Sequence, residues 1–299
     1  MIARQFVRQY ANAAGVDEDV AALEVVLTYV LQRIGELGLW ERLAFKGGTS
    51  LRKAVFGSSG RFSQDIDLLA VDADEPKAED QLLDGLVRDQ YHGLVFEAAD
   101  FRYSLEGNFA AVVEYRHDYG AGRFELQISH RRDLVLPTRM VGLIAQTYFQ
   151  RLEFAPAMLH NVHPIEMLAE KLLACARRLG GSGKDVYDLH QYSQRPIEFE
   201  ILRRVVCAKG WTDRVAFDPD AFLRDLDPRR FAWQELRGLV GRGQMVEQAG
   251  ACRTIQERYR PLRDLTELER RVLSDATAHR DQSAYRALVD EARRLDEAR

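Results

Sequence analysis

The spacing of apolar residues near the start of the chain predicts a long amphipathic helix. Apolar side chains recur three or four residues apart over 20–37, which places them on one face of a helix. The residues of this apolar stripe are Leu23, Leu27, Val30, Ile34 and Leu37. Gly38 follows directly, and glycine commonly ends a helix.

Short runs rich in apolar and β-branched residues come next and predict strands. The expected strands cover 43–46, 65–71, 94–105, 109–117 and 123–129, with a hairpin turn at 119–122. Two helices are expected between the early strands. One is capped by Thr49 or Ser50, and the other begins at Pro76 and runs to about residue 91. This order of elements predicts a small mixed sheet.

The second half of the chain has helical periodicity. Helices are expected over 163–179, 185–192, 197–209, 229–239, 265–276 and 282–294. We therefore expect an α+β protein, with a sheet-containing N-terminal domain followed by a helical C-terminal domain. The division between the two is expected within 137–162.

Composition constrains partners and location. The 299 residues are 46% hydrophobic, enough for one large domain or two ordinary ones. A formal charge of −4 argues against a globally basic nucleic-acid binder, although arginine pairs at 131–132, 177–178 and 203–204 allow local basic surfaces. Three scattered cysteines argue against a disulfide framework. Because no apolar run approaches the roughly 20 residues of a membrane helix, and no signal-peptide core is evident, we expect a cytoplasmic protein that does not bind membranes.

Two acidic residues stand in the second predicted strand. Asp65 and Asp67 are two residues apart, so their side chains point to the same face. Two carboxylates among apolar neighbours repel each other unless a cation lies between them. Such a pair can hold one or two Mg²⁺ ions, and Mg²⁺ carries the phosphates of a nucleoside triphosphate (NTP).

A paired glycine precedes these carboxylates by the length of a helix. Gly47 and Gly48 let backbone N–H groups approach phosphates closely. Thr49 and Ser50 add hydroxyl groups at the N-terminus of the next helix, where anions bind readily. A second acidic pair, Asp72-Ala73-Asp74, has no such glycines upstream, and helix capping explains it.

The segment over 46–68 reads KGGTSLRK…RFSQDIDL. It resembles the DNA polymerase β-like nucleotidyltransferases, and among them the AbiEii/AbiGii toxin family, which includes the MenT tRNA nucleotidyltransferase toxins. A second segment, AEKLLACARRLGGSGKDVYDL, resembles the family pattern Glu-Lys-Leu followed by Arg-Asp-x-Tyr-Asp-Leu, with Lys184 in place of the arginine. The resemblance implies a nucleotidyltransferase domain with N-terminal helices over 1–150 and a helical domain over 151–299.

The resemblance also implies roles for single residues in the second segment. Lys171 edges the apolar stripe of its helix, from where it would pair with the triphosphate. Asp188 would orient this lysine or act in proton transfer. Both residues of the helical domain are therefore expected to contribute to the catalytic site.

Further contacts with phosphate and metal are implied in the first domain. Ser63 would contact phosphate together with Gly48 and Ser50. Polymerase β-like enzymes usually have a third carboxylate on a neighbouring strand, and relatives often carry it where this chain has Gln127, which cannot be an anionic ligand. Either Glu125 is the third metal ligand, or two carboxylates suffice.

The function implied by the resemblance is that of a toxin from a toxin–antitoxin system. The enzyme would use Mg²⁺ to transfer a nucleoside monophosphate from an NTP to the 3′ end of tRNA, which would block aminoacylation and translation. Its antitoxin would be AbiEi-like, and a monomer is expected. Three alternatives stay open: modification of a small molecule, nucleotidylation of a protein, and a degenerate module that binds nucleotide without catalysis.

Overall fold

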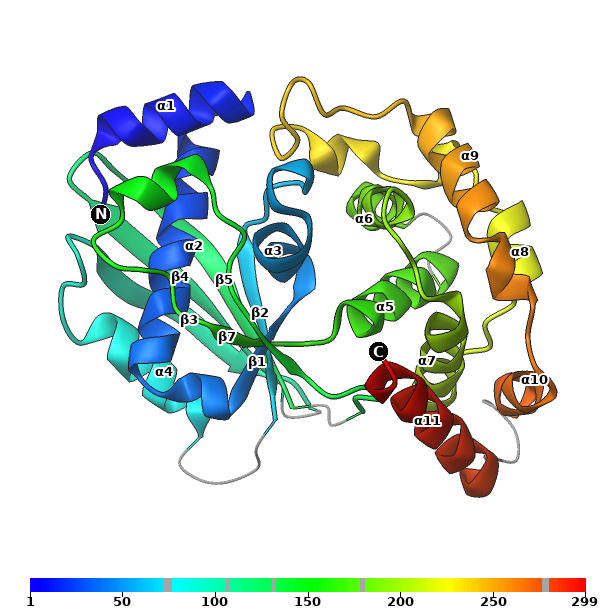
Figure 1. Cartoon of the computed structure of the whole chain (residues 1–299). Coiled ribbons are helices and arrows are strands. Elements are labelled where there is room, and N and C mark those ends of the chain that lie inside the picture. The colour runs from blue at the N-terminus through cyan, green and yellow to red at the C-terminus, as the bar shows by residue number, and fades with distance from the viewer. Residues whose placement is uncertain (72–76, 106–107, 131–132, 178–180, 276–279) are drawn as a thin grey trace. The chain divides into compact units, whose positions relative to one another are not determined.

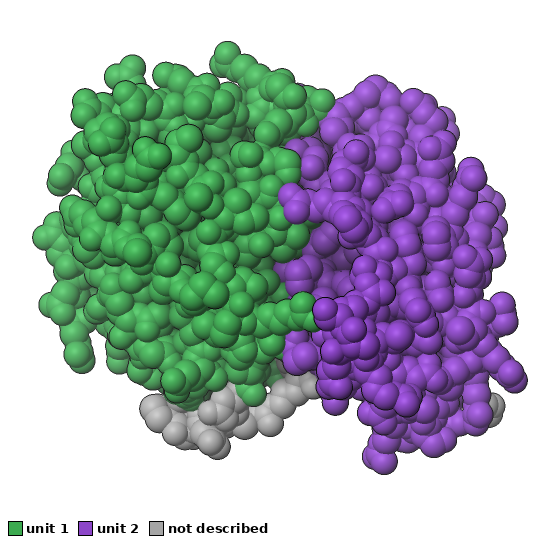
Figure 2. Space-filling view, viewed as in Figure 1, with its two compact units in different colours: residues 1–132, 138–162, 238–245 green, residues 133–137, 163–237, 246–299 purple. Residues whose placement is uncertain are grey.

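The computed structural model describes residues 1–71, 77–105, 108–130, 133–177, 181–275 and 280–299. Contacts between residues divide the chain into two compact units (Figure 2). Unit 1 comprises 1–132, 138–162 and 238–245, and unit 2 comprises 133–137, 163–237 and 246–299. The chain therefore passes between the units several times, whereas the sequence predicted one division after residue 150.

Unit 1 contains a mixed sheet with seven strands among the described residues (Figure 1). The strands are β1 (Leu43–Lys46), β2 (Asp65–Ala70), β3 (Val95–Tyr103), β4 (Phe109–His117), β5 (Gly120–Ser129), β6 (Arg139–Val141) and β7 (Leu159–Asn161). Their order in space is β3-β4-β5-β2-β1-β7-β6. β2 pairs antiparallel with β1 and parallel with β5. All five predicted strands are present, and the α+β fold with a small mixed sheet is confirmed.

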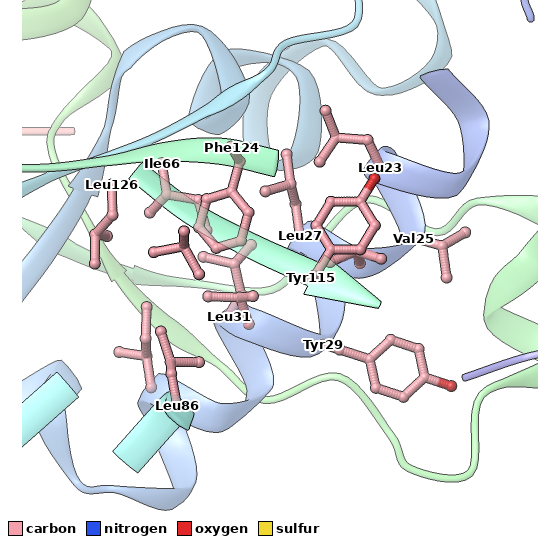
Figure 3. Close-up of a cluster of buried hydrophobic side chains, with 14 of the residues drawn as sticks. Leu23, Val25, Leu27, Tyr29, Leu31, Ile66, Leu86, Tyr115, Phe124 and Leu126 are labelled. Atoms are coloured by element: carbon pink, nitrogen blue, oxygen red, sulfur yellow. The ribbon is translucent and has the colours of Figure 1, made fainter. Parts of the chain in front are cut away.

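Helix α2 (Glu18–Glu36) packs against this sheet (Figure 3). Leu27 and Leu31 of α2 belong to the same buried apolar cluster as Ile66 of β2 and Phe124 of β5. Full burial of each such side chain is worth about 1.5–3 kcal/mol relative to leaving it exposed. Leu23, Leu27, Val30 and Ile34 of the predicted stripe are buried, as expected. Every residue over 21–31 is buried as well, so this part of the helix is not amphipathic as predicted but is covered on all sides. The remaining helices of at least eight residues in unit 1 are α1 (Arg4–Ala14) and α4 (Ala78–Val87).

The helix after the paired glycine differs from the prediction. α3 (Gly47–Ser50) begins at Gly47, and its N-cap residue Lys46 makes no side-chain cap, so the predicted capping by Thr49 or Ser50 is wrong. The helix then widens into a π-helical turn over Leu51–Phe56. Pro76, the expected start of the next helix, and the acidic pair Asp72-Ala73-Asp74 lie outside the described residues, as do Arg131-Arg132 and Arg178.

The described residues of unit 2 are helical, with strands confined to unit 1. Its helices are α5 (Pro164–Arg177), α6 (Gly183–Ser193), α7 (Phe199–Thr212), α8 (Pro219–Arg224), α9 (Gln248–Arg258), α10 (Glu267–Ser274) and α11 (Gln282–Glu297). α7 is the central helix, in contact with α5, α10 and α11. No helix in the described ranges is long and apolar enough to span a membrane.

The predicted helix over 229–239 is wrong. The chain forms two short 3₁₀ turns there, Pro228–Arg230 and Trp233–Leu236. Asp227 caps the first turn, and the indole N–H of Trp233 donates to the carbonyl of Pro228 at 2.8 Å. Trp233 and Leu236, both in the second turn, are buried without a regular helix.

Candidate functional site

The register of β2 and β5 brings four polar side chains onto one face of the sheet. Asp65 lies beside Glu125, and Asp67 beside Gln127. Ile66, between the two aspartates, points into the core. Nε2 of Gln127 donates to Oε2 of Glu125 at 2.9 Å. Asp65 and Asp67 thus share a face of the sheet with Glu125, the candidate third metal ligand. One carboxylate oxygen of Glu125 accepts a hydrogen bond from Gln127.

Gly47 brings the glycine turn directly against Asp67. Its φ is +77°, a left-handed conformation that glycine adopts without strain. A Cβ atom placed on Gly47 would lie 1.9 Å from Oδ2 of Asp67. Lys46, just before the turn, is the partner of Asp67 across the β1–β2 ladder. The carboxylate of Asp67 therefore occupies space that any other residue at position 47 would fill.

Two hydroxyl groups hold Asp65. Ser63 Oγ donates to Oδ1 of Asp65 at 2.6 Å, and Thr49 Oγ1 lies 3.2 Å from the same oxygen. Thr49 also donates to the backbone carbonyl of Asp65. Because one donor comes from the glycine motif and the other from the loop before β2, the orientation of Asp65 is coupled to both segments. Thr49 and Ser63, expected to contact phosphate, are engaged here with the carboxylate.

Ser50 lies deeper in unit 1. Its side chain is fully buried, and its hydroxyl donates to Oδ1 of Asn161 on β7 at 2.7 Å. The Asn161 amide in turn donates to the carbonyl of Val162. In this arrangement, Ser50 joins the glycine motif to the neighbouring strand.

Carboxylates without nitrogen or sulfur donors suit a hard cation such as Mg²⁺, which typically takes one or two carboxylates and completes its shell with water and phosphate. Asp65 and Asp67 fit this pattern. Among the described residues, no group of three or more His, Cys, Asp or Glu side chains is arranged to hold a metal ion. Glu125 is therefore not grouped with Asp65 and Asp67 as a third metal ligand in this structure.

In unit 2, Lys171 of α5 is held between two carboxylates of α6. Its Nζ lies 2.7 Å from Oδ1 of Asp185 and 3.1 Å from Oδ2 of Asp188. Asp188 has a side chain only 2% exposed, whereas that of Lys171 is 17% exposed. Ser182, and not Asp185, caps α6 by accepting from the N–H of Lys184. Asp185, in the first turn of α6, fixes the ammonium group together with Asp188.

The cysteines take no part in these clusters. Cys175, Cys207 and Cys252 are buried and free of disulfides. Burial raises the pKa of the Cys175 thiol well above its usual value, although Lys171 lies one helical turn away. The thiol is therefore protonated at neutral pH and is a poor nucleophile.

Sequence reasoning missed one side chain at the glycine turn. A Cβ atom on Gly48 would lie 2.6 Å from Nη2 of Arg61. The signal was present, since Arg61 opens the RFSQDID segment, but arginines are common and only the fold shows where this one points.

A family model described as nucleotidyl transferase AbiEii toxin, type IV toxin–antitoxin system, matches residues 29–291. The structure is similar to that of MenT4, a nucleotidyltransferase toxin from Mycobacterium tuberculosis, with a TM-score of 0.83 and 25% identity over 98% of this chain and 100% of that one. The fold also resembles JHP933 from Helicobacter pylori, at a TM-score of 0.52 and 14% identity over 83% of this chain and 94% of that one. A search of curated proteins found no match.

Proposed function

The chain belongs to the AbiEii family of nucleotidyl transferase toxins, and from this premise we propose that it transfers a nucleoside monophosphate from an NTP to the 3′ end of tRNA. The observation that carries the proposal is the placement of Asp65 and Asp67 at the glycine turn. Thr49 and Ser63 orient the first carboxylate, and Gly47 makes room for the second. A metal–nucleotide complex needs this combination of fixed oxygen ligands and a close backbone approach.

The proposed reaction is a displacement at phosphorus. The oxygen of an acceptor hydroxyl bonds to the α-phosphorus while the bond to the β-phosphate oxygen breaks. The electron pair leaves with pyrophosphate, and the hydroxyl proton passes to water. When bound, Mg²⁺ would neutralise phosphate charge and lower the pKa of the acceptor hydroxyl. The protein contributes position and charge, which supply most of the catalysis in phosphoryl-type transfer.

We assign Lys171 to the phosphates and Asp188 to the orientation of Lys171. The 3.1 Å pair between them supports orientation over proton transfer, because the Asp188 carboxylate is already engaged with the ammonium group. Asp185 restrains the same ammonium group from the first turn of α6. Lys171 lies between these two carboxylates, and 17% of its side chain is exposed.

The tRNA acceptor is proposed from the family and from the similarity to MenT4, which is itself named a nucleotidyltransferase toxin. Extension of the 3′ end would block aminoacylation and hence translation. The type IV toxin–antitoxin assignment implies an antitoxin partner, which we propose to be AbiEi-like. We further propose that the enzyme acts as a monomer in the cytoplasm.

The proposal is tested by incubating the purified protein with total tRNA, Mg²⁺ and each α-labelled NTP in turn, with γ-labelled NTP as control. Label from the α-position on tRNA, and none from the γ-position, is the expected result. Label on a protein band would show that the acceptor is a protein and not tRNA. Consumption of NTP without label on tRNA or protein would indicate a small-molecule acceptor. Absence of NTP turnover with every acceptor tried would overturn the proposed activity.

A further inference from the structure

Donor groups from the loop before β2 surround Gly48. A Cβ atom on Gly48 would lie 2.6 Å from Nη2 of Arg61 and 3.0 Å from Oγ of Ser63. The guanidinium and the hydroxyl therefore meet at one point against the backbone of the glycine turn. The guanidinium carries N–H donors and the turn offers backbone N–H groups, whereas the Ser63 hydroxyl donates its hydrogen to Asp65.

Arg61 is held in place at this point. Its residue is only 5% exposed, and Nη1 donates to the carbonyl of Phe62 at 3.3 Å. The N–H of Phe62 donates to the carbonyl of Leu239 at 2.7 Å, and the guanidinium of Arg52 lies 3.6 Å from the centre of the Phe62 ring. Because its burial and its hydrogen bond to Phe62 restrict the Arg61 side chain, little side-chain entropy remains to be lost when an anion binds.

The two glycines separate an acidic flank from a basic flank. A carboxylate oxygen of Asp67 lies where a side chain at position 47 would begin. A guanidinium nitrogen of Arg61 lies where a side chain at position 48 would begin. A metal–triphosphate complex requires both flanks, since the metal takes carboxylate oxygens and the phosphates take charged N–H donors. A guanidinium can bind two phosphate oxygens in a bidentate manner, which an ammonium group cannot do.

We propose that Arg61 binds the two phosphates that leave as pyrophosphate, and so makes the site selective for a polyphosphate end. The inference rests on the proposed function, because it assigns a residue to the substrate of that same site. Ser63 orients Asp65, as its 2.6 Å hydrogen bond shows, so Arg61 is the cationic donor on this flank. Loss of Arg61 should therefore weaken the binding of NTP and pyrophosphate without changing the binding of the acceptor.

The test compares wild type with Arg61→Ala, Arg61→Gln and Arg61→Lys, with the exposed Arg88→Ala as the matched control. The Michaelis constants for NTP and for tRNA, and product inhibition by pyrophosphate, are measured with Mg²⁺ present. For Arg61→Ala we expect a rise in the NTP constant and in the pyrophosphate inhibition constant of about ten- to a hundredfold, the usual weight of a hydrogen bond to a charged group. Arg61→Lys should recover part of this loss, and the tRNA constant should stay unchanged.

Calorimetric titration with magnesium pyrophosphate separates this inference from the proposed function. Wild type that binds pyrophosphate and transfers nothing would overturn the function, while weaker binding in Arg61→Gln would still support Arg61. Wild type that transfers nucleotide while folded Arg61→Gln and Arg61→Lys keep wild-type affinity for NTP and pyrophosphate would overturn the role of Arg61 alone. If Arg61→Ala fails to fold, the two larger variants carry the test, with thermal melting as the check of folding.

Discussion

Gly47 meets two requirements that no other residue meets together. It adopts a φ of +77°, and it leaves space for the Asp67 carboxylate. Gly38 has a similar φ of +71° with nothing within 4 Å of its missing Cβ. A substitution at Gly38 therefore introduces backbone strain alone, worth about 1–3 kcal/mol, whereas the same substitution at Gly47 also displaces Asp67.

We expect Gly47→Ala to abolish most nucleotide transfer, because the new methyl group displaces Asp67. Gly38→Ala should lose similar stability and keep its transfer rate. Thermal melts and transfer assays on both variants check this prediction. Equal rates in the two variants would show that the position of Asp67 does not depend on Gly47.

The Lys171–Asp188 pair allows a second test at this scale. Lys171→Met should lower the rate of transfer about a hundredfold or more, the loss typical of removing one electrostatic donor. Asp188→Asn should cost less, since Asp185 still restrains the ammonium group at 2.7 Å. The ratio of kcat between the two variants is the measurement. A larger loss for Asp188→Asn than for Lys171→Met would favour a direct proton-transfer role for Asp188.

At the scale of elements, a buried ionic cluster fastens the π-helical turn to α2. Oε1 of Glu24, on α2, forms ion pairs with Nε of Arg52 at 3.4 Å and with Nζ of Lys53 at 3.1 Å. All three side chains are at most 2% exposed. Lys53 also donates to the Glu24 carbonyl and to the Thr28 hydroxyl, at 2.8 Å each. The cluster sets where the glycine turn lies, because Arg52 and Lys53 follow Ser50 within one turn.

Removal of the anion should therefore destabilise unit 1. Glu24→Gln leaves two buried cations without a counter-charge, for which we expect a loss of about 3–5 kcal/mol in the free energy of unfolding. Surface Glu18→Gln, which breaks exposed pairs, should cost less than about 1 kcal/mol. Denaturant titration of both variants measures the difference. Equal losses would contradict the importance of the buried cluster.

The same cluster predicts a dependence of stability on pH. Burial raises the pKa of Glu24, but Lys53 and Arg52 outweigh it, so the pKa of Glu24 is lowered on folding. A carboxyl with a lowered folded pKa stabilises the protein above its unfolded pKa, and this stabilisation is lost as the pH falls through the folded value. Wild type should therefore lose more stability below about pH 4.5 than Glu24→Gln does.

Sequence patterns predicted elements better than they predicted how side chains are used. The stripe of α2 and the strand pattern around Asp65 depend on local periodicity, which the sequence shows directly. The hydrogen bonds of Thr49, Ser50 and Arg61 depend on partners from other elements, and periodicity carries no information about these. The ion pairs of Arg52 and Lys53 in the π-helical turn likewise depend on Glu24, which lies on another helix.

At the scale of the whole chain, the segment 238–245 shows that the two units are not consecutive parts of the sequence. This stretch belongs to unit 1, although helices of unit 2 precede and follow it. Leu239 accepts from the N–H of Phe62, and the amide of Arg242 donates to the carbonyl of Gly15. The loop that carries Arg61 and Ser63 is thus hydrogen-bonded to a segment that lies far from it in the sequence.

Gly241 offers a test of this long-range dependence. A Cβ atom there would lie 2.2 Å from the carbonyl oxygen of Ala14, whereas Gly243 has nothing within 4 Å. Gly241→Ala should destabilise the protein by about 1–3 kcal/mol, as overpacking does, and Gly243→Ala should be nearly neutral. Melting temperatures of the two variants decide the matter. A neutral Gly241→Ala would mean that the segment 238–245 moves without cost.

We propose that nucleotide transfer to tRNA requires the carboxylates of Asp65 and Asp67. The most direct measurement is incorporation of α-labelled nucleotide into tRNA by wild type and by the isosteric double variant Asp65→Asn/Asp67→Asn at equal protein concentration. We predict labelled tRNA with wild type and background label with the double variant, at unchanged melting temperature within about 2 °C for so local a change. Wild-type labelling by the folded double variant would contradict the account.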